Sequence, residues 1–162
     1  MRMHEFINEN AQLDIDGYPQ QTDYSCGDAA IRSIIKYFGL DVPSEKQIIK
    51  VAGTSKKFGT LPGQMVDALK KYNIHAVTKT SNVNELMEII KEKTPAALLL
   101  TYQKEAHWML LVAVADNSIK LFDPYRNKNI FLTKEELKNM WRAKTNGEEH
   151  FQTVVVAKVI LD

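Results

Sequence analysis

The sequence of 162 residues is poor in cysteine, in arginine and in long apolar runs, and it carries almost no net charge. Its one cysteine, Cys26, excludes an intramolecular disulfide and a cysteine-rich zinc site of the finger type. The longest apolar run, 108–115, is far shorter than the ~20 residues of a membrane-spanning helix, so we expect no membrane insertion. A formal net charge of +1 gives no electrostatic basis for binding nucleic acid. The N-terminus lacks the apolar segment of a secretory signal, so we expect a cytoplasmic protein.

The remaining composition, 44% hydrophobic and 25% charged, is that of an ordinary folded domain. Apolar residues at helical spacing, preceded by capping residues such as Ser44 and Thr133, predict helices over 26–38, 44–52, 62–72, 82–91 and 133–141. Runs of β-favouring residues between turn residues predict strands over 74–80, 96–102, 107–115, 118–122 and 151–160. Because helices come first and strands later, we predict one α+β domain over 1–162, its N-terminal helical part packed on an antiparallel sheet.

Cys26 opens the most regular of the predicted helices. A sulfur at that position would lie beside the unpaired amides of the first turn and the positive end of the helix dipole, and both favour the thiolate. The next residue, Gly27, has no side chain that could block a substrate carbonyl. A lone cysteine is more often a small buried apolar residue, so that structural role remains the alternative to a nucleophilic one.

A thiolate nucleophile needs a base, and the sequence offers four histidines: His4, His75, His107 and His150. His107 differs from the others because it begins the most apolar predicted strand, where its ring could face a cleft at the rim of the sheet. A surface histidine at the end of a strand is the alternative. No two histidines stand at a spacing typical of metal ligands, so we expect no metal and no other cofactor.

Asp123, sixteen residues after His107, could orient that base. Pro124 holds Asp123 extended and so fixes the direction of its carboxylate, although Asp-Pro is also a common start of a turn. A hairpin with the loop 115–117 would bring Asp123 opposite Met109, on the face that His107 occupies. A two-residue turn at 116–117 would put His107 and Asp123 on opposite faces, unless the strand is bent.

The oxyanion of an acyl-transfer reaction requires hydrogen-bond donors. The backbone N–H of Cys26 is one candidate, and the side-chain amide of Gln20 or Gln21 is a second. Either glutamine could also be an ordinary surface residue, and the residues alone do not choose between the two.

Three segments together resemble one known family. They are Tyr18-Pro19-Gln20 followed by Cys26-Gly27-Asp28-Ala29-Ala30, then His107-Trp108, then Asp123-Pro124. The residue types of these segments, their order and their spacing are similar to those of the C39 peptidases and their C39-like relatives. These are papain-like cysteine peptidases, best known from bacteriocin-exporting ABC transporters. Ser25 departs from the family pattern, which often has an acidic residue there, and we find no membrane or nucleotide-binding part in this sequence.

The resemblance implies a papain-like fold in which Cys26 is the nucleophile, His107 the general base and acid, Asp123 the orienting carboxylate and Gln20 an oxyanion donor. It implies a cysteine peptidase that cleaves a peptide bond through an acyl-enzyme. Transporter-linked members cleave leader peptides after a double glycine, so leader processing is one form of that activity. The expected partners are a peptide or protein substrate and an exporter acting in trans.

Three alternatives stay open. The same site could serve a thiol-dependent amidase or acyltransferase that acts on a non-peptide substrate. The chain could also be a non-catalytic, peptide-binding C39-like domain. Finally, it could be an α+β interaction domain in which the three residues coincide by chance.

Overall fold

Five helices and eight strands make up residues 11–160, the part of the chain described by the structure, a computed structural model. The helices are α1 (Cys26–Tyr37), α2 (Glu45–Ala52), α3 (Pro62–Lys71), α4 (Val83–Lys91) and α5 (Lys134–Met140). The strands are β1 (Ile74–Thr80), β2 (Ala96–Tyr102), β3 (Glu105–Val114), β4 (Ser118–Asp123), β5 (Lys128–Thr133), β6 (Arg142–Thr145), β7 (Glu148–Phe151) and β8 (Thr153–Val159). The predicted α+β class is confirmed.

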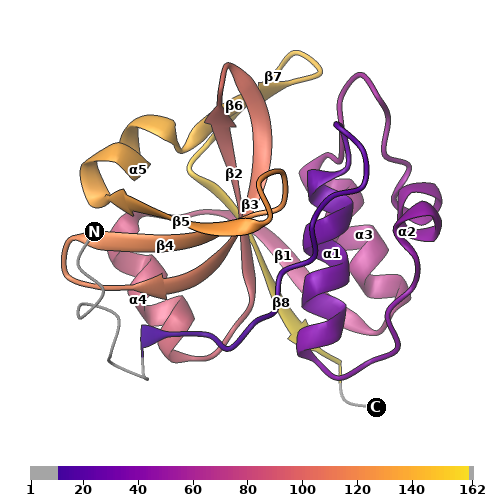
Figure 1. The fold of residues 1–162 in the computed structure, drawn as a ribbon, viewed down its shortest axis with the longest axis horizontal. Coiled ribbons are helices and arrows are strands. Elements are labelled where there is room, and N and C mark those ends of the chain that lie inside the picture. The colour runs from indigo at the N-terminus through magenta and orange to yellow at the C-terminus, as the bar shows by residue number, and fades with distance from the viewer. Residues whose placement is uncertain (1–10, 161–162) are drawn as a thin grey trace.

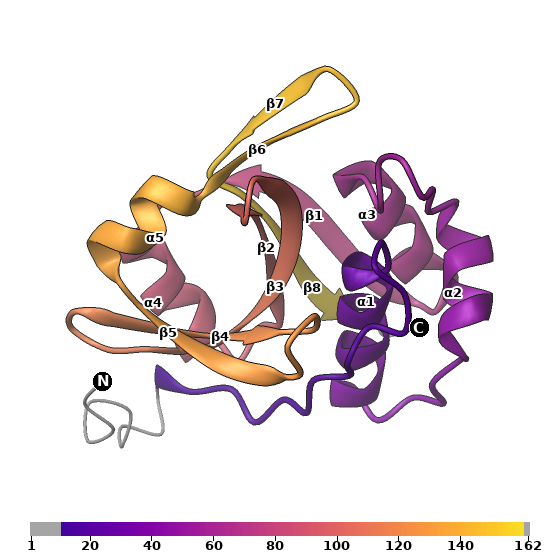
Figure 2. The ribbon, with the colours of Figure 1, turned by 45° about the horizontal axis from the view of Figure 1, so that its top comes forward.

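A six-stranded antiparallel sheet, in the order β1-β8-β2-β3-β4-β5, separates two groups of helices (Figures 1 and 2). Side chains alternate across it, as the two-residue period of a strand requires. Leu99 and Trp108 face the apolar core under α1, α2 and α3, whereas Leu98 and Met109 face a second core under α4 and α5. The N-terminal helices therefore pack on the sheet as predicted, and the later helices cover its other face.

The predicted caps form in three helices. Ser44, Asn82 and Thr133 each accept a hydrogen bond from a backbone N–H three residues later, at 3.1, 2.9 and 3.0 Å. Each bond satisfies a donor that the first helical turn leaves unpaired. Across residues 11–160, no helix is both long and apolar enough to cross a bilayer.

The prediction for the C-terminal region needs correction. Strands β5, β6 and β7 were not predicted. The strand predicted over 151–160 is β8, which begins at Thr153 because Gln152, whose φ is 47°, separates it from Phe151, the last residue of β7. Upstream, α1 ends at Tyr37 rather than at residue 38, and β3 begins at Glu105, two residues before His107. Strands β6 and β7 form a separate two-stranded hairpin that projects beyond the main sheet (Figure 2).

The hairpin of β3 and β4 contains a bulge that sets the position of Asp123. Val114 pairs with Ile119 and the N–H of Ala115 bonds the Ser118 carbonyl, so the connecting turn has two residues. The register shifts between Leu111 and Ala113, where β3 contains one extra residue. Beyond this shift, Asp123 lies opposite Met109, on the face shared with His107.

Candidate active site

Cys26 is the first residue of α1 and lines a cleft of about 740 Å³ together with Gln20 and His107. Its side chain is only 8% exposed and packs at the edge of the core beneath α1. The thiol thus has the burial of a structural cysteine and also the access that a nucleophile needs. The N–H of Trp108 donates to its Sγ at 3.5 Å. Since Cys26 is at the first helical position, its own N–H has no acceptor within the helix.

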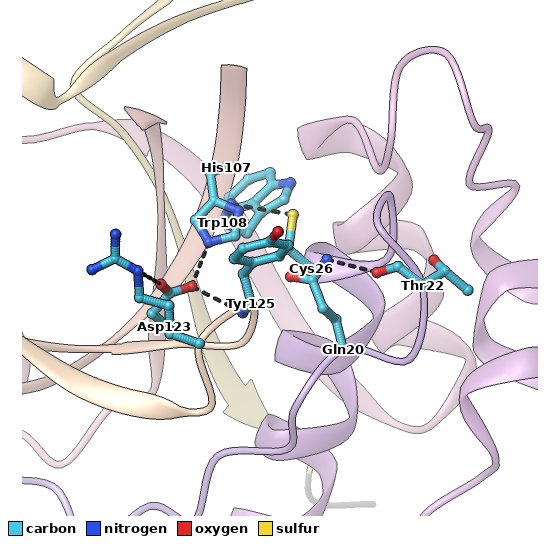
Figure 3. Close-up of polar contacts among 8 residues, drawn as sticks. Gln20, Thr22, Cys26, His107, Trp108, Asp123 and Tyr125 are labelled. Atoms are coloured by element: carbon cyan, nitrogen blue, oxygen red, sulfur yellow. Dashed lines mark hydrogen bonds and ion pairs between the residues drawn. The ribbon is translucent and has the colours of Figure 1, made fainter. Parts of the chain in front are cut away.

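His107 and Asp123 form a buried pair beside Cys26 (Figure 3). Nε2 of His107 is 2.7 Å from Oδ1 of Asp123, and Asp123 is completely buried. The same Oδ1 accepts the N–H of Tyr125 at 2.9 Å, which fixes the carboxylate in the turn after β4. Because Nε2 contacts Asp123, Nδ1 is the ring nitrogen that can exchange a proton with Cys26.

The charges of this cluster determine its protonation. Burial lowers the pKa of His107, but hydrogen bonds to Asp123 and Cys26, together with the charges of both, outweigh burial and raise it to about 9. Burial raises the pKa of Asp123, but the His107 hydrogen bond and charge and the N–H groups of Tyr125 and Arg126 leave it below its usual range. The imidazole therefore holds a proton at neutral pH, and the carboxylate is ionised.

Two further side chains hold the His107 ring in place. The Tyr102 ring stacks on it with centroids 5.7 Å apart and planes at 30°. The Arg126 guanidinium lies 5.0 Å from the centroid of Tyr102, and its Nε is 4.0 Å from Oδ2 of Asp123. Sequence reasoning missed both residues, because stacking contacts between distant segments leave no local pattern.

Of the two glutamines considered as oxyanion donors, Gln20 lines the cleft, whereas the Gln21 side chain is exposed and outside it. The Gln20 side-chain amide donates to the Thr22 carbonyl at 2.7 Å, which orders it below Cys26 (Figure 3). The N–H of Gln20 donates to the Pro124 carbonyl at 3.0 Å and so ties this loop to the segment that follows Asp123. The second N–H of that amide is available to a bound group.

A buried carboxylate from α2 supports the loop before Cys26. Glu45 is 1% exposed, and its Oε2 accepts the N–H of Gln21 at 2.8 Å and the hydroxyl of Ser25 at 2.9 Å. The Ser25 oxygen in turn accepts the N–H of Thr22 at 3.0 Å. Ser25, where the sequence departs from the family pattern, thus connects the loop to a carboxylate elsewhere in the chain.

Asp28, in the first turn of α1, is a second buried carboxyl. Burial raises its pKa to about 7 against the opposing hydrogen bond from Thr54, whose hydroxyl lies 2.7 Å from Oδ1. Thr54 also bonds Thr60 at 2.8 Å, and the Thr60 carbonyl accepts the indole N–H of Trp108 at 2.8 Å. The Gly59-Thr60 segment therefore joins α1 to the start of β3.

Comparison with known proteins identifies the family. The model of the peptidase C39 family matches residues 15–145. The chain belongs to the peptidase C39 family. An uncharacterised protein of Methanothermobacter marburgensis is 29% identical over 105 residues, which cover 65% of this chain and 68% of that protein.

Two solved structures share the fold. A double glycine motif protease from an AMS/PCAT transporter, in complex with its leader peptide, superposes with a TM-score of 0.72 at 16% identity, over 92% of this chain and 94% of that one. The peptidase domain of Streptococcus ComA, a bi-functional ABC transporter of a quorum-sensing pathway, superposes with a TM-score of 0.72 at 17% identity. The match covers 90% of this chain and 98% of that one. The papain-like C39 fold expected from the resemblance is confirmed.

Proposed function

We propose that the chain is a cysteine peptidase that cleaves a peptide bond with Cys26 as nucleophile, His107 as general base and acid, and Asp123 as the orienting carboxylate. The observation that carries this proposal is the 2.7 Å contact between His107 and Asp123 in the cleft that Cys26 lines. Together with the hydrogen bond between Cys26 and His107, this contact supports the proposal, because nucleophilic catalysis needs a base within reach of the nucleophile and a third group that fixes the base.

In the acylation step, the Cys26 sulfur attacks the carbonyl carbon and the C=O electrons move to the oxygen. Nδ1 of His107 then gives its proton to the nitrogen of the scissile bond, the C–N bond breaks and the amine product leaves. The acyl group remains on Cys26 as a thioester.

In the deacylation step, the now neutral His107 takes a proton from water while the hydroxyl attacks the thioester carbon. The C–S bond breaks, the carboxylic acid product leaves and releases its remaining proton to solvent, and the first proton stays on His107 beside the Cys26 thiolate. Asp123 keeps its negative charge throughout and stabilises the imidazolium that each half-reaction requires.

The Gln20 amide and the N–H of Cys26 are the donors that we propose for the oxyanion of both tetrahedral intermediates. Their placement supports this role, because Gln20 lines the cleft and the Cys26 N–H is unpaired within α1. Loss of one such donor typically costs 10²–10³-fold in kcat.

The substrate that we propose is a peptide segment, and leader-peptide processing is the form to test first. The likeness to a double glycine motif protease bound to its leader peptide supports this choice. Since both structural neighbours belong to transporters, an exporter acting in trans is the corresponding partner.

Alkylation tests the activated sulfur without a known substrate. At neutral pH, iodoacetamide should label Cys26 faster than a free thiol of ordinary reactivity, and His107→Ala should remove the excess. His75→Ala is the matched control, because His75 is exposed on β1. Equal rates for wild type and His107→Ala would refute an activated Cys26–His107 pair.

Hydrolysis tests the reaction itself. Internally quenched peptides with a central Gly-Gly pair should be cleaved by the wild type and left intact by Cys26→Ala. The thermal unfolding of that variant should remain cooperative, because only one sulfur at the edge of the core is lost. Cleavage by Cys26→Ala would contradict the proposal.

A further inference from the structure

Four lysines gather around the cleft that contains Cys26, although the chain as a whole carries a net charge of only +1. Lys56 and Lys57 lie on the loop between α2 and α3, Lys104 on the turn between β2 and β3, and Lys144 on β6. All four are exposed. They come from three separate segments, so no local run of basic sequence accounts for the gathering.

None of these lysines forms an ion pair within the part of the chain that the structure describes. Among residues 11–160, no carboxylate lies within ion-pair distance of any of the four, whereas Lys36, Lys79 and Lys91 elsewhere each have one. The Lys57 ammonium lies 5.2 Å from the centroid of the Phe58 ring. The carboxylates that line the cleft are Asp23 and Glu105, both exposed, so positive charge remains in excess there.

The lysines that line the cleft come from two parts of the fold. Lys56 and Lys57 belong to the helical side of the molecule, and Lys104 and Lys144 belong to the sheet and to the projecting β6–β7 hairpin (Figures 1 and 2). A segment bound beside Cys26 would therefore be near lysines contributed by both parts. Clefts lined by charge of one sign raise the local concentration of oppositely charged ligands.

We infer that the cleft selects peptide segments with Asp or Glu side chains close to the scissile bond. The inference rests on the proposed peptidase function for its substrate class, and it adds the charge of that substrate. Acidic side chains would pair with lysines that no carboxylate within residues 11–160 neutralises, whereas basic side chains would be repelled. Because these contacts do not involve the reacting atoms, they should act on KM and on Kd, with kcat unchanged.

Binding to Cys26→Ala tests the inference without requiring catalysis. Fluorescein-labelled peptides with one Gly-Gly core and two flanking Glu, Gln or Lys residues should bind in that order of affinity, as measured by anisotropy. An exposed ion pair contributes about a 1.4- to 5-fold effect, so two Glu residues should be favoured over two Gln residues by about two- to 25-fold. The preference should shrink between 0.01 M and 1 M NaCl, as the screening length falls from about 30 Å to about 3 Å.

Lysine variants locate the effect. In the Cys26→Ala background, Lys56→Gln with Lys57→Gln should reduce the Glu-over-Gln preference by about half or more. Lys70→Gln with Lys71→Gln is the matched control, because these are also adjacent exposed lysines but lie on α3 and do not line the cleft. The control should leave the preference unchanged.

The outcomes separate the inference from the proposed function. Equal binding of the Glu and Gln peptides overturns the inference even if the wild type cleaves both. Selective binding of the Glu peptide without cleavage by the wild type refutes the peptidase and upholds the charge preference. Displacement of the Glu peptide by an equal concentration of a single-stranded oligonucleotide overturns peptide selectivity in favour of a general polyanion site, and failure of every peptide to bind overturns both proposals.

Discussion

Replacing Asp123 by Asn tests how the buried carboxylate controls His107. Asn keeps the size of Asp123 and an oxygen that can accept from Nε2 and from the N–H of Tyr125, but it removes the charge. The rise in the pKa of His107 from 6.5 to about 9 corresponds to about 3 kcal/mol in favour of the imidazolium. Asp123 and Cys26 supply this effect together, so loss of one charge should lower the pKa of His107 by about one to three units.

Titration by NMR of protein labelled at histidine measures this pKa directly, with His107→Gln used to assign the resonance. The upper limb of the pH profile of kcat/KM should move to lower pH with it. Asp67→Asn is the control, because it removes an exposed carboxylate on α3. A His107 pKa near 9 in Asp123→Asn, or near 6.5 in the wild type, would refute the reasoning.

The same variant makes a prediction about stability. The pKa of His107 is raised in the folded state, so its contribution to stability is fully present below pH 6.5 and is lost as the pH rises through about 9. Asp123→Asn should therefore be less stable than the wild type at pH 6, and the difference should narrow by up to about 3 kcal/mol towards pH 10.

Asp123→Ala removes the hydrogen bond that orients the His107 ring as well as the charge, so it should lose more activity than Asp123→Asn.

Three further substitutions test the surroundings of the site by urea unfolding. In the folded chain Asp28 keeps its proton up to about pH 7, whereas in the unfolded chain it releases the proton near pH 3.8. The free energy of unfolding of the wild type should therefore fall by up to about 4 kcal/mol from pH 4 to pH 8. Asp28→Asn should not show this fall. Gly27→Ala should lower the free energy of unfolding by about 1–3 kcal/mol, because the added Cβ would lie 2.6 Å from the Thr60 side chain. Gly63→Ala is the control and should not destabilise the fold, because its Cβ would meet nothing within 4 Å. Leu13→Pro removes the N–H that bonds the Val112 carbonyl at 2.8 Å and should be about 1–3 kcal/mol less stable than Leu13→Ala, which keeps that N–H. The same fall in Asp28→Asn as in the wild type, or equal stabilities within either of the other two pairs, would contradict the contact that the pair tests.

The elements that the sequence predicted well are those whose signals are local. Ser44, Asn82 and Thr133 cap their helices through contacts that span three residues, and Thr133 and Glu136 form the reciprocal capping box. The position of Cys26 at the start of α1 is also local, since it follows from the apolar period of one helix. Such features need no knowledge of the rest of the fold.

The β6–β7 hairpin was missed although its turn carries a strong signal. Asn146 and Gly147, with φ values of 49° and 79°, form an Asn-Gly turn of the kind that two-residue hairpins favour. The flanking segments Arg142–Thr145 and Glu148–Phe151 are short and rich in charge: the first alternates in burial over only four residues, and the second does not alternate. A hairpin outside the main sheet does not need that alternation, because it covers little core.

The support beneath the site could not be predicted, because it depends on contacts between distant segments. Glu45 bonds Ser25 twenty residues away, and the Trp108 indole bonds the Thr60 carbonyl across 48 residues. From the sequence alone, each of these residues is an ordinary member of a helix, loop or strand. Only the packing of α1 against α2 and β3 gives them their roles.

The pairing of His107 with Asp123 depends on both the alternation of side chains along the β3–β4 hairpin and a bulge that the rest of the fold stabilises. The two-residue turn at 116–117 would by itself put the two side chains on opposite faces of the hairpin. The extra residue in β3 between Leu111 and Ala113 reverses this alternation, so that a spacing of sixteen residues brings both to one face. The bulge persists because its carbonyl at Val112 is satisfied from outside the hairpin, by the N–H of Leu13. A bond from the segment before α1 thus stabilises the register on which the 2.7 Å contact depends, and no pattern within β3 or β4 alone could have revealed it.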